Sequence, residues 1–127
     1  MGQFGDQLLS ADKKSMLPPS QWQGRLLMAS DPVVVDPKHY QVEFENDRIR
    51  VLRVAYGPHE KSVMHGHPPN IVVMLTDCDF RFYLPQGKQQ GIFGKTGQLL
   101  CIEEPFEHAP ENLSEKPFEA ICIELKA

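Results

Sequence analysis

The sequence predicts an all-β domain, built as a sandwich or a barrel. Three observations support this prediction: 11 prolines and 9 glycines stand among 127 residues, the apolar residues form short runs, and clusters of turn-forming residues separate these runs. Frequent prolines and glycines favour turns over long helices. Many short strands at regular spacing are typical of sandwiches and barrels. A chain of this length forms one domain with a single core.

The predicted strands follow one another from residue 40 to residue 125. Apolar patterns between turn residues place them at 40–44, 49–56, 71–75, 79–84, 89–95, 98–102 and 118–125. The run 71–75 is continuously apolar, which predicts a strand covered on both faces. In the last strand, Ile121, Ile123 and Leu125 share one face because side chains alternate along a strand.

Residues 1–35 are predicted to form an N-terminal arm, and residues 36–127 the barrel domain. Pro18 and Pro19 end any helix before them, so the arm has at most one short helix. The segment Val33–Val35 is β-branched and bracketed by prolines, which predicts a short edge strand because proline cannot donate to a ladder. Since an exposed edge can add to a partner's sheet, we expect a homodimer.

Composition and charge argue against several classes of function. A net charge of −4 provides no basic stripe, so we expect no nucleic-acid partner. The longest apolar run is far too short to cross a bilayer, and the first residues lack the pattern of a signal peptide, so we expect no membrane association. Three cysteines without paired spacing indicate reduced thiols and predict a cytoplasmic protein. Cys78 lies in a predicted turn and is expected to be exposed.

Two histidines separated by one residue, His65 and His67, predict a metal site. On an extended backbone their side chains point to the same face, and Pro68 keeps His67 out of the helical region. His108 can meet them from a neighbouring strand, which would give three neutral imidazole ligands for a divalent ion. We expect His39 and His59 to lie at the surface, although His59 could supply a fourth ligand.

Segment 57–126 resembles the cupins, small β-barrel proteins, in both of that family's motifs. His65 and His67 match the motif G-x5-H-x-H-x3,4-E-x6-G, while Gly97, His108 and Asn112 match G-x5-P-x-G-x2-H-x3-N. The chain is similar to a subgroup that carries H-x-H-P-P and includes proteins associated with β-alanine degradation. The resemblance implies a jelly-roll barrel with a divalent metal ion on the three histidines. Iron is the first expectation, with manganese, nickel and zinc as alternatives.

The sequence departs from the motifs at the expected glutamate ligand, which falls at Ile71 or Val72. Counting parity from His65 and His67 favours Ile71 as the inward position. Turn residues of the motifs are also replaced, at His59, Cys78, Glu103 and Pro105. Without the glutamate, three neutral histidines leave the ion its full +2 charge. Such a centre should attract a small anionic ligand and keep coordination positions open for substrate, water or oxygen.

Three functions remain open at this point. The resemblance implies a mononuclear Fe(II) dioxygenase-like enzyme acting on a small carboxylate-bearing metabolite, since three-histidine iron centres in cupin-like enzymes belong to dioxygenases. A non-catalytic small-molecule-binding protein is the second reading. A metal-dependent isomerase or lyase is the third, and it would need a general base that the sequence does not identify, so no catalytic residue is assigned. Glu107 could orient His108 or belong to a solvated acidic loop, and Asn112 is interpreted as structural.

Overall fold

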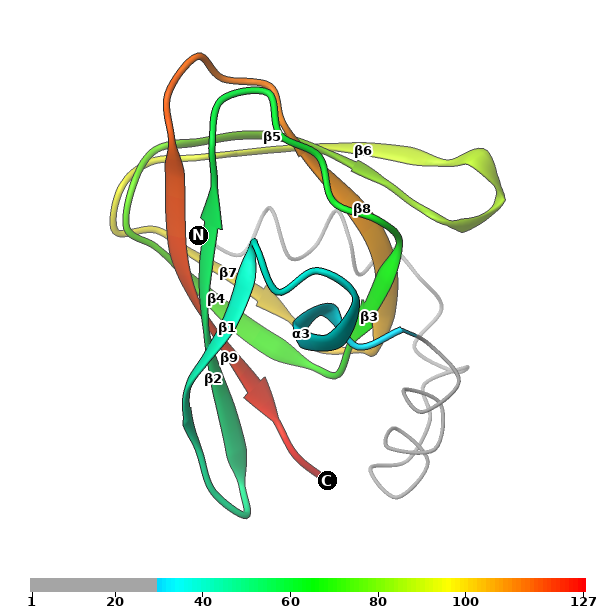
Figure 1. The fold of residues 1–127 in the computed structure, drawn as a ribbon, viewed down its shortest axis with the longest axis vertical. Coiled ribbons are helices and arrows are strands. Elements are labelled where there is room, and N and C mark those ends of the chain that lie inside the picture. Colours follow the sequence, from blue (N-terminus) through cyan, green and yellow to red (C-terminus); the bar gives the residue numbers. More distant parts are fainter. Residues whose placement is uncertain (1–29) are drawn as a thin grey trace.

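The computed structural model describes residues 30–127, which form two antiparallel sheets around one core (Figure 1). The strands are β1 (Tyr40–Glu45), β2 (Ile49–Tyr56), β3 (His65–His67), β4 (Asn70–Met74), β5 (Cys78–Tyr83), β6 (Gln89–Gly94), β7 (Leu99–Ile102), β8 (Phe106–Asn112) and β9 (Phe118–Leu125). One sheet has the order β1-β2-β9-β4-β7, and the other β3-β8-β5-β6. The predicted all-β jelly-roll architecture is confirmed.

The chain crosses from one sheet to the other at Pro68 and Pro69. Before them, β3 pairs with β8; after them, β4 pairs with β7 and β9 in the other sheet. Proline lacks the N–H that a ladder requires, so a pair of prolines suits the corner between two ladders. Side-chain alternation therefore does not continue from β3 into β4, and parity counted across this corner has no meaning.

The core lies between the two sheets and is mainly apolar. Leu52, Tyr56, Met74, Ile92 and Leu100 are almost completely buried. The strand β9 turns its even-numbered residues, from Phe118 to Glu124, toward this interior. Ile121, Ile123 and Leu125 do share a face, and it is the outer face of the sheet.

The predicted edge strand at Val33–Val35 is wrong, because residues Pro32–Val35 form one helical turn, α3. Asp31 caps this turn by accepting a hydrogen bond from the Val33 amide, and Pro32 occupies the first helical position, where it suits a helix best. These local signals outweigh the β-branched preference for strand. The homodimer remains a prediction, but α3 removes the strand addition on which it was based. The predicted helix within residues 1–29 lies outside the described residues.

Two predictions about solvent exposure are also wrong. Cys78 is buried because β5 begins at this residue and places it on the same inward face as Phe80 and Phe82. His39 is buried because its ring stacks on Tyr56, with ring centroids 4.1 Å apart.

A short 3-10 turn, η2 (Pro85–Gly87), joins β5 to β6. Within residues 30–127 no helix is long and apolar enough to cross a membrane.

Candidate metal centre

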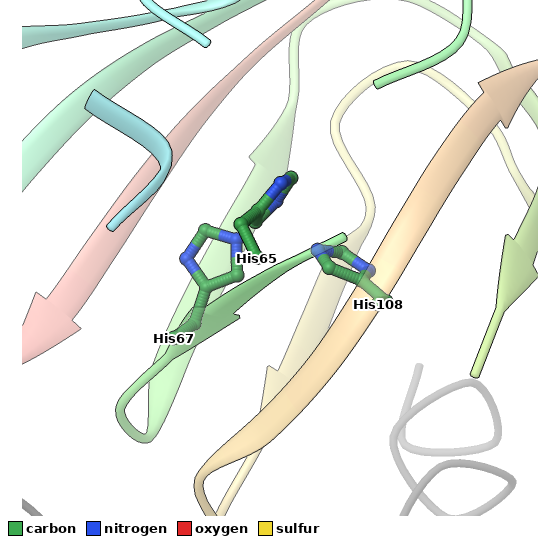
Figure 2. Close-up of side chains that lie close together, drawn as sticks. All are labelled: His65, His67 and His108. Carbon is green, nitrogen blue, oxygen red and sulfur yellow. The ribbon is translucent and has the colours of Figure 1, made fainter. Parts of the chain in front are cut away.

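Three histidine side chains converge inside the barrel at the end covered by α3. His65 and His67 extend from β3, and His108 extends from β8, where it lies directly opposite His65 in the ladder (Figure 2). Their ring centroids are 4.8, 4.9 and 5.1 Å apart. One ligand nitrogen from each ring lies within 4.8 Å of the other two, and all three residues are buried. The structure thus brings together the three residues that the sequence suggested.

Hydrogen bonds define which nitrogen two of these rings present to the cluster. Nδ1 of His65 lies 2.8 Å from the carbonyl oxygen of Val63, and Nδ1 of His67 lies 2.8 Å from a carboxylate oxygen of Glu124. Both oxygens only accept, so each Nδ1 carries a hydrogen, and Nε2 is the nitrogen of each ring that is left to face a metal ion. A metal-binding histidine is ordinarily held in this way by a partner on its other nitrogen.

His108 is buried with no hydrogen-bond partner for either ring nitrogen among the described residues, and Nε2 of His65 is in the same condition. Leaving a buried polar atom without a partner costs about 1–3 kcal/mol. A divalent ion would provide the missing partner for these lone pairs, because neutral imidazole is among its preferred ligands. The residues present therefore fit a metal ion.

Glu124 is the functional residue that sequence reasoning missed. It lies on β9, and its oxygens are shared between His67 Nδ1 at 2.8 Å and Arg50 Nε at 2.8 Å. Burial by itself would raise the pKa of Glu124, but the contacts with His67 and Arg50 outweigh it and hold this pKa below its ordinary value. The carboxylate is therefore ionised, and it forms an ion pair with Arg50. The sequence did contain a signal for it, because side chains alternate along a strand and Glu124 therefore shares the inward face of β9 with Ala120 and Cys122.

A second group of potential ligands, His67, Cys122 and Glu124, overlaps with the three-histidine cluster. Both oxygens of Glu124 are already engaged, and burial raises the pKa of the Cys122 thiol well above its ordinary value. Metal ions bind the thiolate rather than the thiol. We therefore interpret this group as support for His67 and not as a second metal site.

The remaining candidates lie away from the cluster or act structurally. His59 is exposed and pairs with Glu115, so it is a surface residue as expected and not a fourth ligand in this structure. Glu107 stands opposite Gly66 in the ladder, one residue out of phase with His108, so its side chain points to the other face. Asn112 is structural, as interpreted, because its amide bonds to the backbone of Gly57 and Lys116.

Burial disfavours the protonated form of His65 and of His108. Desolvation, with a smaller contribution from nearby His67, lowers the pKa of His65 to about 3. The pKa of His108 lies well below its ordinary value for the same reason. Metal ligation needs neutral imidazole, so neither of these ligands has to lose a proton at neutral pH.

We expect the metal-free protein to lose stability as the pH falls below about 6.5, the ordinary histidine pKa. The unfolded chain protonates His65 and His108 near that pH, whereas the folded protein protonates His65 only near pH 3. Between these values the unfolded state holds more protons, so the free energy of unfolding falls by up to about 1.4 kcal/mol per pH unit for each histidine. Urea unfolding between about pH 7 and 5 measures the slope; equal stability across this range would contradict it.

A small apolar cavity adjoins the cluster. Its volume is about 60 Å³, enough for a few water-sized groups. His67 and His108 lie at its wall, and the other lining residues are mainly aromatic and aliphatic, including Tyr40, Tyr56 and Val72. No lysine, arginine, aspartate or glutamate lines it in the part of the chain that the structure describes.

The fold and the histidine cluster define a cupin-fold protein with a candidate metal centre. The structure of a cupin domain from Bordetella pertussis is similar, with a TM-score of 0.64 and 26% sequence identity over 69% of this chain and 92% of that chain. A protein from Klebsiella pneumoniae with a double-stranded β-helix domain has a TM-score of 0.56 at 13% identity, over 87% and 89% of the two chains.

Oxalate decarboxylase from Bacillus subtilis, described with Mn(II) centres, is also similar in fold. Its TM-score is 0.51 at 16% identity, over 63% of this chain and 22% of the other. No protein-family model matches the sequence, and no curated protein matches it. At these identities the likeness to the Klebsiella and Bacillus structures shows the shared fold, and the chemistry must be argued from this chain's own residues.

Proposed function

We propose that this protein binds one divalent metal ion through Nε2 of His65, Nε2 of His67 and a ring nitrogen of His108. The observation that carries the proposal is the convergence of three buried histidine rings, two of which, His65 and His108, have ring nitrogens without a hydrogen-bond partner among the described residues. Two of these rings are already fixed in the tautomer that metal ligation requires. We propose iron as the native metal, with manganese, nickel or zinc as alternatives.

We further propose that the centre serves a dioxygenase-like enzyme acting on a small carboxylate-bearing metabolite. Bound Fe(II) would supply redox chemistry with oxygen and would polarise a ligand oxygen. The protein contributes an apolar cavity and three histidine ligands, and Glu124 is held between His67 and Arg50. Because no described lining residue is cationic, the ion itself would be the main attraction for an anionic group.

The cavity lining argues against the isomerase or lyase alternative. Such a reaction requires a general base within reach of the substrate. The titratable lining groups besides histidine are tyrosines and thiols: burial raises the pKa of Tyr40 and Tyr56 well above the ordinary tyrosine value and the pKa of Cys78 to about 12. None of them is a base near neutral pH. The same lining suits a non-catalytic binding protein, which remains the second candidate.

We expect about one metal ion per chain after reconstitution of tag-free protein with Fe(II), Mn(II), Ni(II) or Zn(II), since such sites need at least three protein ligands. Elemental analysis measures the ratio. Absence of bound metal from all four samples would contradict the proposed centre.

Oxygen uptake then separates the two candidate functions. The iron-loaded protein should consume oxygen with at least one member of a panel of small carboxylates and thiols, while the zinc-loaded protein should not, because Zn(II) has no redox chemistry. Tight binding of a carboxylate without oxygen uptake in any iron-loaded sample would favour the binding protein instead.

We also propose that the protein belongs to the H-x-H-P-P subgroup, which is linked to β-alanine degradation. This proposal makes β-alanine and its oxidised acids the first members of the panel.

A further inference from the structure

The helix α3 (Pro32–Val35) has an aspartate at each end, and each aspartate is connected to a different histidine of the cluster. Asp31 is its N-cap and Asp36 its C-cap. The helix lies against β1 and β3, over the strand that carries two of the three proposed ligands (Figure 1). We use the name clamp segment for residues 30–36.

The first connection runs from Asp31 to His67. The guanidinium of Arg50 donates two hydrogen bonds of 3.0 Å to the two oxygens of Asp31, in a fork that fixes both groups. The same guanidinium donates through Nε to Glu124 at 2.8 Å, and Glu124 accepts from His67 Nδ1. The carboxylate that orients His67 is thus held by an arginine that is itself anchored on the clamp segment.

The second connection runs from Asp36 to His65. The Ser62 hydroxyl donates to a carboxylate oxygen of Asp36. With its hydrogen committed in this direction, the Ser62 oxygen can accept from Nδ1 of His65, which lies 3.3 Å away. This contact supplements the shorter hydrogen bond from the same nitrogen to Val63. His39 also bonds to Asp36, at 2.7 Å, and keeps that carboxylate in place.

A backbone contact completes the attachment. The amide of Gly66, the residue between His65 and His67, donates to the carbonyl oxygen of Ser30 at 2.8 Å. The clamp segment therefore bonds to the strand β3 at the one residue that separates two proposed ligands. Three connections, which start from Ser30, Asp31 and Asp36, therefore link the clamp segment to β3 and to its two histidines.

We propose that the clamp segment positions the metal centre, with Asp31 and Asp36 as positioning residues, and that its docking and metal binding are coupled. The proposal rests on the three-histidine centre proposed above. A docked clamp holds His65 and His67 in the geometry and tautomer that favour the metal ion. Coupling of this kind is reciprocal, so bound metal must stabilise the docked clamp by the same factor.

Two substitutions test the two connections without removing any proposed ligand. Asp31→Asn keeps a good helix cap but replaces the charge that anchors Arg50, and Ser62→Ala cuts the connection to His65. We expect each to weaken Zn²⁺ binding by about tenfold in isothermal titration, the low end for groups that support metal ligands. Arg53→Gln is the matched control, because Arg53 lies on the same strand as Arg50 and pairs with Glu43 and Glu119, away from the cluster. It should bind Zn²⁺ like the parent.

Hydrogen exchange provides a readout that a merely structural role would not change. The amides of Val34, Val35 and Asp36 bond within the helical turn, so their exchange reports opening of the clamp segment. Saturating Zn²⁺ should slow their exchange by about tenfold or more in the parent, and by less in Asp31→Asn. The amide of Leu84, bonded to Lys88 at the β5–β6 turn, should exchange at the same rate with and without metal.

The outcomes distinguish this proposal from the one on which it rests. Zn²⁺ binding by the parent, with both variants like the parent and unchanged exchange in the clamp segment, would overturn the coupling and leave the metal centre intact. No binding by the parent would overturn both. Weaker binding in the two variants, with metal-dependent exchange confined to the clamp segment, is the result that we expect.

Discussion

Replacing His108 with leucine should reduce metal affinity by at least about 100-fold without lowering the stability of the metal-free protein. Loss of a direct ligand should exceed the 10- to 100-fold effect of losing a supporting group. His108 is buried between Phe82 and Phe106 and has no hydrogen-bond partner for either nitrogen. Leucine removes that unpartnered polar group and leaves an apolar side chain of similar size in an apolar site.

Isothermal titration with Zn²⁺ and urea unfolding of the metal-free protein measure the two quantities. His59→Ala is the control, because His59 is an exposed histidine outside the cluster and its loss should change neither. A leucine variant that binds metal as tightly as the parent would show that His108 is an ordinary core residue. A loss of affinity without a loss of stability separates a ligand from a residue that only fills space.

Val72→Glu should tighten metal binding by about tenfold, which corresponds to about 1.4 kcal/mol. The cavity is lined by Asn70, Val72 and Met74, so the even-numbered residues of β4 face the cavity that adjoins the cluster. A glutamate at residue 72 would extend into a cavity whose wall includes His67 and His108. A carboxylate that reaches the ion offsets its own burial by pairing with it. The added charge should also weaken the binding of small carboxylates.

Ile71→Glu is the matched control for this substitution. Ile71 lies on the outer face of the sheet and is only half-buried, so a glutamate there should leave Zn²⁺ affinity unchanged. The metal-free Val72→Glu protein should unfold more readily than the parent, and saturating metal should restore its stability. If Val72→Glu remains folded and binds metal more weakly than the parent, residue 72 does not occupy the place of the missing ligand.

The sequence by itself determined the fold class and the three histidines that meet. Alternation along short strands depends only on neighbouring residues, so the face shared by His65 and His67 could be read directly. The interval from these residues to His108 carried the resemblance to cupins, which supplied the pairing of strands that local patterns do not specify. The bounds of β2 and β9 matched the prediction, since clear turn residues flank β2 and Pro117 immediately precedes β9.

Where a segment turns a corner or caps a helix, local patterns were misleading. The pair Pro68 and Pro69 moves the chain to the other sheet, so the parity that favoured Ile71 over Val72 was wrong. The β-branched run Val33–Val35 became helical because Asp31 caps it and Pro32 begins it. In both cases a short-range backbone constraint outweighed side-chain preference.

Only the tertiary structure decided which residues support the cluster. Glu124 reaches His67 from a strand 57 residues later in the chain, and Arg50 joins Glu124 to Asp31 across 74 and 19 residues. No spacing rule predicts such contacts, because they depend on the order of strands in the sheet and on the docking of α3. The ligands of this centre follow from alternation along a strand, whereas the groups that hold them follow from which strands become neighbours.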